Sequence, residues 1–314
     1  MLRRRRIPQP DTSLSMFLPM REFLADTATE PEWLWQELLA PGSITLLAGK
    51  PKVGKSTLVY GLLGALAEEG TSFIGRAARP TGALILSEEP REAIAAKVAR
   101  FGGREHHIAD RRELRAEAWT DQVAKAGAYA RTNCLGLIVV DTFADLAGLR
   151  GEEENDAGAV LGALDPIKRE AEQEDLAVLL VHHQRKSGGS HGDGVRGSGA
   201  LVAGVDISAE LNRGVSGSAR TLTYLSRYST GRLAVELTSD GYVASGSQED
   251  TDFAQILAAL DERGAAPTPE IHEVTGIARR TLDRRLTKMR ERNLIEPVGG
   301  SIQNGVPTVW TRAA

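Results

Sequence analysis

The segment that most constrains this chain reads Gly49-Lys50-Pro51-Lys52-Val53-Gly54-Lys55-Ser56. It fits the pattern GxxxxGK[ST], which indicates a phosphate-binding loop when it lies between a strand and a helix. Both neighbours are predicted here, because an apolar run at residues 44–48 precedes the segment and a helical stretch at residues 56–69 follows it. The alternative is a tight strand-to-helix turn without a ligand.

Each residue type in this loop suits a triphosphate. Glycines let backbone N–H groups curl around phosphate oxygens without a Cβ clash, and the helix adds its N-terminal donors and dipole. Lys55 would place a positive charge beside the β and γ phosphates, and Ser56 would offer a hydroxyl to Mg²⁺. ATP and Mg²⁺ are therefore the expected ligands. The residues expected to line the nucleotide are Gly49, Lys50, Pro51, Lys52, Val53, Gly54, Lys55, Ser56 and Thr57. Lys50 and Lys52 make the loop unusually basic, and the sequence leaves open whether they contact nucleotide or solvent.

Short apolar runs alternate with helical stretches from about residue 43 to residue 240, which predicts an α/β fold with a mainly parallel sheet covered by helices on both faces. The expected strands are residues 44–48, 83–87, 136–141 and 176–182, and the expected helices are 21–40, 56–69, 91–101 and 157–172. Two late segments, 221–227 and 233–237, predict a hairpin. In the first helix, Trp33, Leu34 and Leu38 are the expected anchors.

Acidic residues follow two of the predicted strands. Asp141 ends the run Leu137-Ile138-Val139-Val140, at the strand end where such sheets bind ligands, so it is the expected second metal ligand beside Ser56; the alternative is an acid that caps the next helix. Thr142, the next residue, is not an acid, so the carboxylate that orients water must come from elsewhere. Glu88 is preferred over Glu89 for this role, although both could be solvated acids at a helix start.

The strand at residues 176–182 leads into His182 and His183, whose side chains could hydrogen-bond the γ-phosphate. A zinc site with His191 and Asp193 is disfavoured, because the spacing is wrong for a structural zinc site and cysteines are missing.

These motifs together resemble the RepA-like branch of the RecA/DnaB ATPases. The resemblance covers about residues 25–240 and includes the phosphate loop, Ile85-Leu86-Ser87-Glu88-Glu89, Val140-Asp141-Thr142, Val181-His182-His183-Gln184-Arg185-Lys186-Ser187 and Val195-Arg196-Gly197-Ser198-Gly199. It implies a RecA-like core and hexameric rings with ATP bound between subunits. It also implies that Glu88 is the catalytic carboxylate, that His183 (or His182) senses the γ-phosphate, and that Arg227 is an arginine finger for a neighbouring copy. For Arg227 the alternative is a surface arginine at a strand edge.

The stretch from Arg185 to Gly199 is rich in glycine, serine and basic residues. The resemblance implies that it lines the ring channel, where Arg185, Lys186 and Arg196 would follow the phosphates of single-stranded DNA. The alternative is a lid or a subunit contact without DNA.

Residues 251–314 predict a second domain, a winged helix, joined by a linker at residues 244–250. Three helices are expected: one with Phe253, Ile256, Leu257 and Leu260 at helical spacing, one at residues 267–274 with Thr268 as its N-cap, and one at 279–293. A β-hairpin wing formed by residues 295–298, Gly299-Gly300 and residues 306–310 is expected to follow. The third helix carries candidate DNA-binding residues: Arg279, Arg280, Arg284, Arg285 and Lys288. The alternative is a protein-docking module with a solvated basic face.

The remaining composition sets limits on partners and location. A net charge of −4 excludes a basic coat over the whole surface, so DNA contacts must be local. Residues 1–20, with Arg3 to Arg6, are expected to be a flexible tail; the alternative is an arm that contacts nucleic acid phosphates. No apolar run is long enough to span a membrane. The single cysteine, Cys134, excludes an internal disulfide and suggests a cytoplasmic protein. The leading hypothesis is an ATP-driven DNA motor of the RepA-like helicase type; the alternatives are an ATP-switched DNA-binding regulator and a helicase-accessory ATPase.

Overall fold

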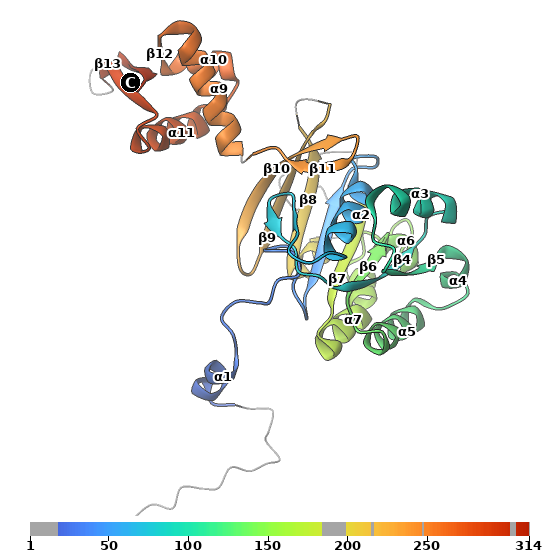
Figure 1. Ribbon diagram of the computed structural model, residues 1–314. Helices are drawn as coiled ribbons and strands as arrows, with labels where there is room; N and C mark the ends of the chain where they lie inside the picture. The colour runs from blue at the N-terminus through green and yellow to red at the C-terminus, as the bar shows by residue number, and fades with distance from the viewer. Residues whose placement is uncertain (1–17, 184–198, 215–216, 247, 302–305, 314) are drawn as a thin grey trace, which may run out of the picture. The chain divides into compact units, whose positions relative to one another are not determined.

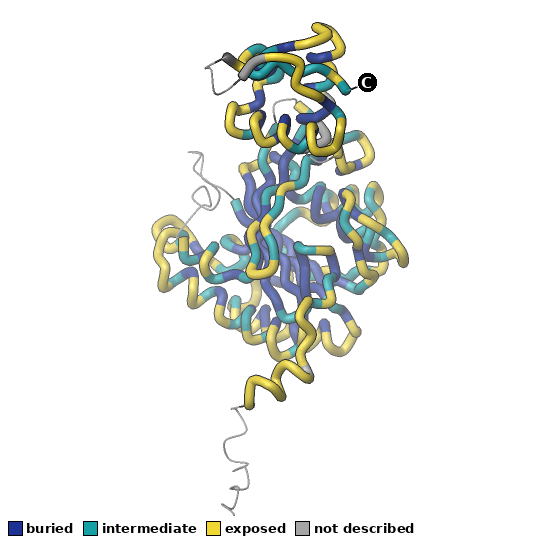
Figure 2. The backbone as a smooth tube through the Cα atoms, turned by 90° about the vertical axis from the view of Figure 1, so that its left-hand side faces the viewer, coloured by how far each residue is buried: buried dark blue, intermediate teal, exposed yellow. Residues whose placement is uncertain are grey.

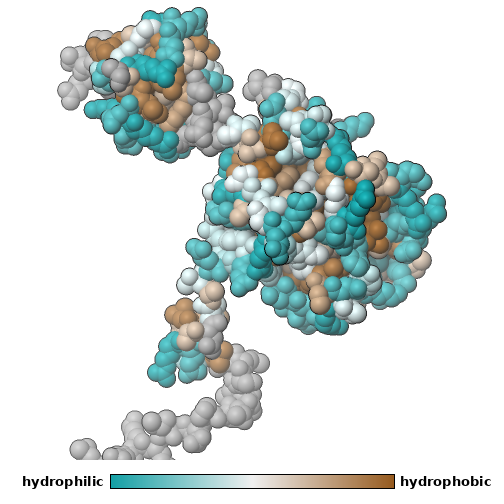
Figure 3. Space-filling model, in the orientation of Figure 1, coloured by the Kyte–Doolittle hydropathy of each residue, from teal (hydrophilic) through white to brown (hydrophobic). Residues whose placement is uncertain are grey.

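The computed structural model describes residues 18–183, 199–214, 217–246, 248–301 and 306–313. Contacts divide the chain into two compact units, residues 1–32 and 33–314. In the first unit, helix α1 (Met20–Asp26) begins after Pro19, which cannot donate a hydrogen bond and fits a helix start. The helix exposes Met20, Phe23 and Leu24, and Leu18 just before it is exposed as well. Brown atoms mark hydrophobic residues in this segment in Figure 3.

The helix predicted over residues 21–40 is wrong beyond Asp26. Residues 33–39 instead form turns, in which Trp35 makes isolated bridges with Leu39 and Ala78. Leu34 and Leu38 are buried as expected, because these turns pack onto the core of the second unit. Their apolar spacing therefore reflected burial rather than helical periodicity.

The described part of the second unit is built on a nine-stranded sheet with the order β11-β10-β9-β8-β1-β7-β6-β4-β5. The strands are β1 (Ile44–Gly49), β4 (Gly82–Ser87), β5 (His107–Asp110), β6 (Leu135–Asp141), β7 (Ala177–His183), β8 (Ile207–Arg213), β9 (Ala219–Ser226), β10 (Thr230–Thr238) and β11 (Gly241–Ala244). Neighbouring strands are parallel in the part of the sheet with the order β8-β1-β7-β6-β4-β5. The remaining part, β8 to β11, is an antiparallel meander. A small hairpin, β2 (Ser72–Phe73) and β3 (Arg76–Ala77), lies apart from this sheet.

Helices cover both faces of the sheet (Figure 1). On one face lie α2 (Lys55–Leu66) and α3 (Arg91–Phe101). On the other lie α5 (Trp119–Thr132), α6 (Phe143–Leu146), α7 (Ala157–Glu174) and α8 (Gly199–Ala203); α4 (Arg111–Leu114) follows β5. Residues of the central strands alternate between the two resulting cores, which leaves the sheet buried between half-exposed helices (Figure 2). The predicted α/β architecture and the late hairpin are confirmed, with element ends shifted by a few residues.

The C-terminal residues form a hydrophobic cluster of their own. Its elements are α9 (Gln248–Arg263), β12 (Ala265–Pro267), α10 (Thr268–Thr275), α11 (Arg279–Glu291), β13 (Ile295–Ser301) and β14 (Val306–Arg312). The strands form an antiparallel sheet of order β12-β14-β13. Gly276 ends α10 with a φ of 65°, which confirms the predicted tight turn.

Two local predictions in this region are wrong. The predicted linker at residues 244–250 overlaps both β11 and α9, which begins at Gln248. Thr268 is the first residue of α10 rather than its cap, and its hydroxyl donates to the carbonyl of Thr308 and accepts from Trp310 Nε1. The predicted pairing of two late strands is found, with Gly299-Gly300 inside β13.

None of the helices in the described residues combines the length and the apolarity needed to span a bilayer.

Candidate nucleotide-binding site

The phosphate loop joins the end of β1 to the start of α2, as its pattern predicts. Two glycines are required by close approaches of the meander. A Cβ on Gly49 would lie 2.8 Å from the carbonyl oxygen of Leu211 on β8. Gly54 has a φ of 108°, a backbone conformation that disfavours other residues, and a Cβ there would collide with the hydroxyl of Tyr242. The loop conformation therefore depends on both glycines.

Lys55 is held inside this loop by backbone carbonyl oxygens. Its side chain is only 6% exposed, and its Nζ donates to the carbonyl oxygens of Gly49 at 2.8 Å and Lys50 at 3.3 Å. Burial lowers the pKa of Lys55 to about 8, although the nearby Asp141 opposes the shift. An incoming phosphate would therefore meet a preplaced cation. Lys50, Pro51 and Lys52 are exposed, and Thr57 is half-buried.

His183 meets Lys55 because of the strand register. Strands β1 and β7 pair in parallel with Gly49 opposite His183 and Ala48 opposite His182. Nδ1 of the half-buried His183 lies 3.1 Å from Lys55 Nζ. His182 is buried. The structure thus places His183 beside Lys55, and both histidines line the same cavity.

Ser56 and Asp141 face each other across the loop, as predicted for a metal site. The Ser56 hydroxyl donates to Oδ2 of Asp141 at 3.5 Å, and Asp141 is 5% exposed. Burial raises the pKa of Asp141 to about 6, with Glu89 adding to the rise and Lys97 and Lys55 opposing it. A hydroxyl and one carboxylate fit Mg²⁺, which shares its remaining positions between water and phosphate. No group of three His, Cys, Asp or Glu residues in the described chain could hold a metal by itself.

Glu88 and Glu89 have different partners in the structure. Glu88 is held by Thr142, whose hydroxyl donates to Oε1 at 2.9 Å, and the Glu88 N–H donates to the Asp141 carbonyl at 3.0 Å. Burial raises the pKa of Glu88 to about 7, and a hydrogen bond with Asp145 adds to the rise. Glu89 instead forms an ion pair with Lys97 on α3. Of the two acids, only Glu89 is engaged in an ion pair with a lysine, and the choice of Glu88 as the carboxylate that orients water stays a prediction.

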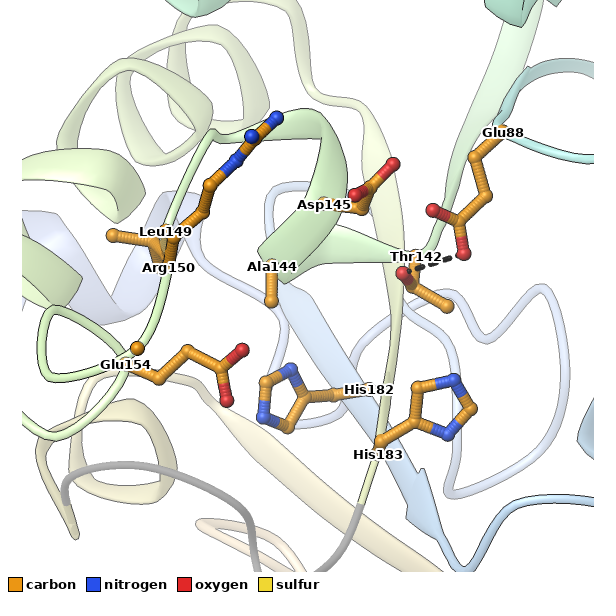
Figure 4. A pocket seen from close by; sticks show the side chains of 10 residues that line it. Glu88, Thr142, Ala144, Asp145, Leu149, Arg150, Glu154, His182 and His183 are labelled. Carbon is orange, nitrogen blue, oxygen red and sulfur yellow. Dashed lines mark hydrogen bonds between the residues drawn. The ribbon is translucent and has the colours of Figure 1, made fainter.

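Glu88 and the two histidines line a cavity of about 440 Å³, and Figure 4 shows their side chains around it. Its lining is mostly polar and charged, and the residues are Glu88, Thr142, Ala144, Asp145, Leu149, Arg150, Gly151, Glu154, His182 and His183. The cavity gives water and a second charged group room to approach the γ-phosphate position. Sequence reasoning did not single out Thr142 or Asp145 as contributors here, since both belong to the turn after β6.

Arg227 lies far from the phosphate loop of its own chain. Strand β9 runs antiparallel to β8, so Arg220 near its start pairs with Arg213 at the end of β8 that lies next to the phosphate loop. Ser226 at the end of β9 pairs with Ile207 at the other end of β8. An eight-residue strand spans about 25 Å at about 3.3 Å per residue. Arg227 Nε lies 3.6 Å from Oδ1 of Asp206 at that other end, and its side chain is mostly exposed.

Side chains of the meander contact the outer side of the phosphate loop, a feature with no sequence signal. Arg220 Nε donates to the carbonyl oxygen of Val53 at 2.9 Å, and the Tyr242 hydroxyl donates to the same oxygen at 3.2 Å. Arg213 Nη2 donates to the carbonyl oxygen of Lys52 at 3.1 Å. These pairs are separated by about 160 to 190 residues in the chain, so no local pattern reports them.

The predicted DNA-binding residues have mixed outcomes. Arg185, Lys186 and Arg196 lie outside the described residues. On α11, Arg279, Arg280 and Arg284 are exposed and Lys288 is half-buried. Arg285 is a correction: it is buried, and its Nε donates to Oδ2 of the buried Asp252 at 2.8 Å. The Arg285 side chain therefore lies in the interior between α9 and α11 and is not exposed for contact with DNA.

Comparisons with known proteins agree with the fold and with the loop. The AAA_25 family model, described as an AAA domain, matches residues 9–189, more than half of the chain. A search of curated proteins finds no match. Among solved structures, a KaiC-like protein from the hyperthermophilic archaeon Pyrococcus horikoshii is similar, with a TM-score of 0.50 and 17% identity. The match covers 69% of this chain and 96% of that one, and it shows a shared fold.

Proposed function

Because the chain belongs to the AAA-domain family of P-loop ATPases, we propose that it is an ATP-driven DNA motor, a RepA-like replicative helicase. The supporting observation is that charged groups lie at opposite ends of the strands of one sheet. Lys55 and Glu88 follow the carboxyl ends of parallel strands, and Arg227 lies beyond the other ends of these strands. An arginine that cannot reach its own triphosphate can reach one bound by a neighbour in a head-to-tail ring.

Hydrolysis in this proposal uses groups that are already in place. Lys55 neutralises charge on the β and γ phosphates. Glu88, oriented by the Thr142 hydroxyl, accepts a hydrogen bond from the attacking water and aligns it with the γ-phosphate. His183 contacts the γ-phosphate from beside Lys55 and responds to its loss. Ser56 and Asp141 would hold Mg²⁺, which would supply positive charge for the phosphate oxygens.

Arg227 completes the site from a neighbouring copy. An arginine supplied in trans raises hydrolysis rates by about 10³–10⁵ in the systems where it has been measured. The exposure of Arg227 and its long 3.6 Å contact with Asp206 leave its guanidinium able to change partners. We propose a homo-hexamer, in which each chain gives its arginine to one neighbour and receives one from the other.

DNA would be contacted at two places. The segment with Arg185, Lys186 and Arg196 follows β7 and would line the ring channel for a single strand. The C-terminal order of helix, strand, two helices and a two-stranded hairpin supports a winged helix. Its exposed Arg279, Arg280 and Arg284 would then face duplex phosphates or base edges.

A strand-displacement assay with and without ATP tests the proposal. The wild-type chain is expected to unwind a forked duplex only with ATP, and single-stranded DNA is expected to stimulate hydrolysis. Lys55→Ala should do neither, because the cation at the phosphate position is gone. The motor proposal is rejected if DNA is not unwound and hydrolysis does not respond to DNA.

The second candidate is an ATP-switched DNA-binding regulator. The C-terminal elements have a separate hydrophobic cluster and an exposed basic helix, so duplex binding there requires no motor. Sequence-specific duplex binding that survives Lys55→Ala, without any strand displacement by the wild-type chain, would favour this candidate.

A further inference from the structure

The direction of each peptide plane determines what a phosphate loop can bind, because the loop binds through backbone N–H groups. In a trans peptide, the C=O of one residue and the N–H of the next point to opposite sides. A side chain that holds a loop carbonyl on the outside therefore fixes the following N–H toward the inside. The peptide between Val53 and Gly54 is the one held most firmly in this way.

Two buried donors hold the Val53 carbonyl. Arg220 on β9 donates through Nε at 2.9 Å, and Tyr242 on β11 donates through its hydroxyl at 3.2 Å; each residue is 6% exposed. The Arg220 guanidinium is itself fixed, since Nη1 donates to the carbonyl oxygens of Gly217 at 2.7 Å and Ala219 at 2.8 Å. Two donors to one carbonyl, both out of solvent, leave that peptide little freedom to turn.

Contact between Tyr242 and Gly54 adds a steric restraint. The Tyr242 hydroxyl lies where a Cβ of Gly54 would be, so the ring limits movement of the loop toward the meander. The N–H of Gly54 donates to none of the described residues. It therefore remains available to a ligand on the inner side of the loop.

We propose that Arg220 and Tyr242 are positioning residues that turn the Gly54 N–H toward the β-phosphate of a bound nucleotide. The proposal depends on nucleotide binding by the loop and on no DNA activity. It predicts a selective effect, because the β-phosphate is present in ADP and ATP and absent from AMP. A variant without one of these donors would lose the same contact in the ground state and in the transition state. Its KM for ATP should therefore rise while its kcat changes little.

The test compares Tyr242→Phe with Tyr224→Phe. Both substitutions remove one buried hydroxyl from the meander, but the Tyr224 hydroxyl bonds with Arg76 and Glu37 and does not contact the loop. Equilibrium binding of a fluorescent ADP, with AMP as competitor, is measured for wild type and both variants. One hydrogen bond corresponds to about a three- to tenfold change in Kd. Tyr242→Phe should weaken ADP by this factor and leave AMP unchanged, and Tyr224→Phe should leave both unchanged.

A second variant guards against a general folding effect. Arg220→Lys keeps a donor for the Val53 carbonyl, whereas Arg220→Met has a similar length and no donor, so ADP affinity should fall more in the methionine variant at similar melting temperature. The proposal is overturned if Tyr242→Phe and Tyr224→Phe weaken ADP equally, if neither does, or if ADP and AMP weaken together. Failure of the wild-type chain to bind ADP would instead refute the nucleotide site itself.

Discussion

Replacing Glu88 by glutamine is expected to stabilise the folded chain at high pH while it slows hydrolysis. Burial raises the pKa of Glu88 from an ordinary 4.5 to about 7. A carboxyl with a raised pKa binds its proton more tightly in the folded state, so stability falls as the pH rises from about 4.5 to about 7. Glutamine is neutral throughout, has nearly the same shape and still accepts from Thr142.

The size of this gain follows from the pKa. A carboxyl pKa raised from 4.5 to about 7 corresponds to about 3 kcal/mol of stability when the group is fully buried. Glu88 is only half-buried, so solvent screening reduces the expected gain to about 1–2 kcal/mol above pH 8. At pH 5 the folded carboxyl of the wild type is protonated but the unfolded one is still mostly ionised, so about a quarter of the gain should remain.

Urea unfolding at pH 5 and pH 8.5, without nucleotide or Mg²⁺, measures this difference. Glu89→Gln is the matched control: Glu89 pairs with Lys97, so its loss should destabilise the chain or leave it unchanged at high pH. Hydrolysis by the Glu88→Gln variant should fall by about 10²–10⁴, the usual contribution of a positioned base. A gain that is equal at both pH values, or no gain at all, would refute the assignment of a buried, unfavourably charged Glu88.

Three further outcomes are expected. Hydrolysis at saturating Mg²⁺ and ATP should rise with pH through about 7, because the carboxylate form of Glu88 orients water; a profile flat between pH 6 and 8 would contradict this. Arg227→Ala and Lys55→Ala should each be inactive alone, yet mixing them should restore part of the hydrolysis, since an intact loop can then meet an intact arginine; no recovery on mixing counts against action in trans. Arg285→Ala should cost about 3–5 kcal/mol in the C-terminal elements by removing a charged donor from the buried Asp252, and Arg284→Ala should weaken DNA binding without changing melting; thermal unfolding and DNA titration distinguish the two.

Local patterns were sufficient for much of the site. The phosphate loop is encoded in eight consecutive residues, and Asp141 and Glu88 each follow a short apolar run, so strand-end geometry located them without tertiary information. The contact between Lys55 and His183 required one more fact, the parallel register of β1 and β7. That register follows from the α/β pattern, which is why the histidine could be anticipated.

Long-range pairing determined what the sequence could not predict. Arg220 and Tyr242 reach Val53 only because a meander of four strands continues the sheet beyond β1, and nothing in their local sequence indicates this. Arg285 looked like its exposed neighbours until its burial against Asp252 was known. The false helix at residues 33–40 has the same origin, since tertiary contacts of Trp35 overrode an apparently helical spacing.

The most direct test of a nucleotide site shared between copies is the mass of the assembly with and without a non-hydrolysable ATP analogue. Native mass spectrometry or light scattering on the full chain would suffice. A hexamer is expected with the analogue, and Lys55→Ala should fail to form it. A strict monomer under both conditions would leave Arg227 without a triphosphate to contact and would contradict a nucleotide site shared between copies.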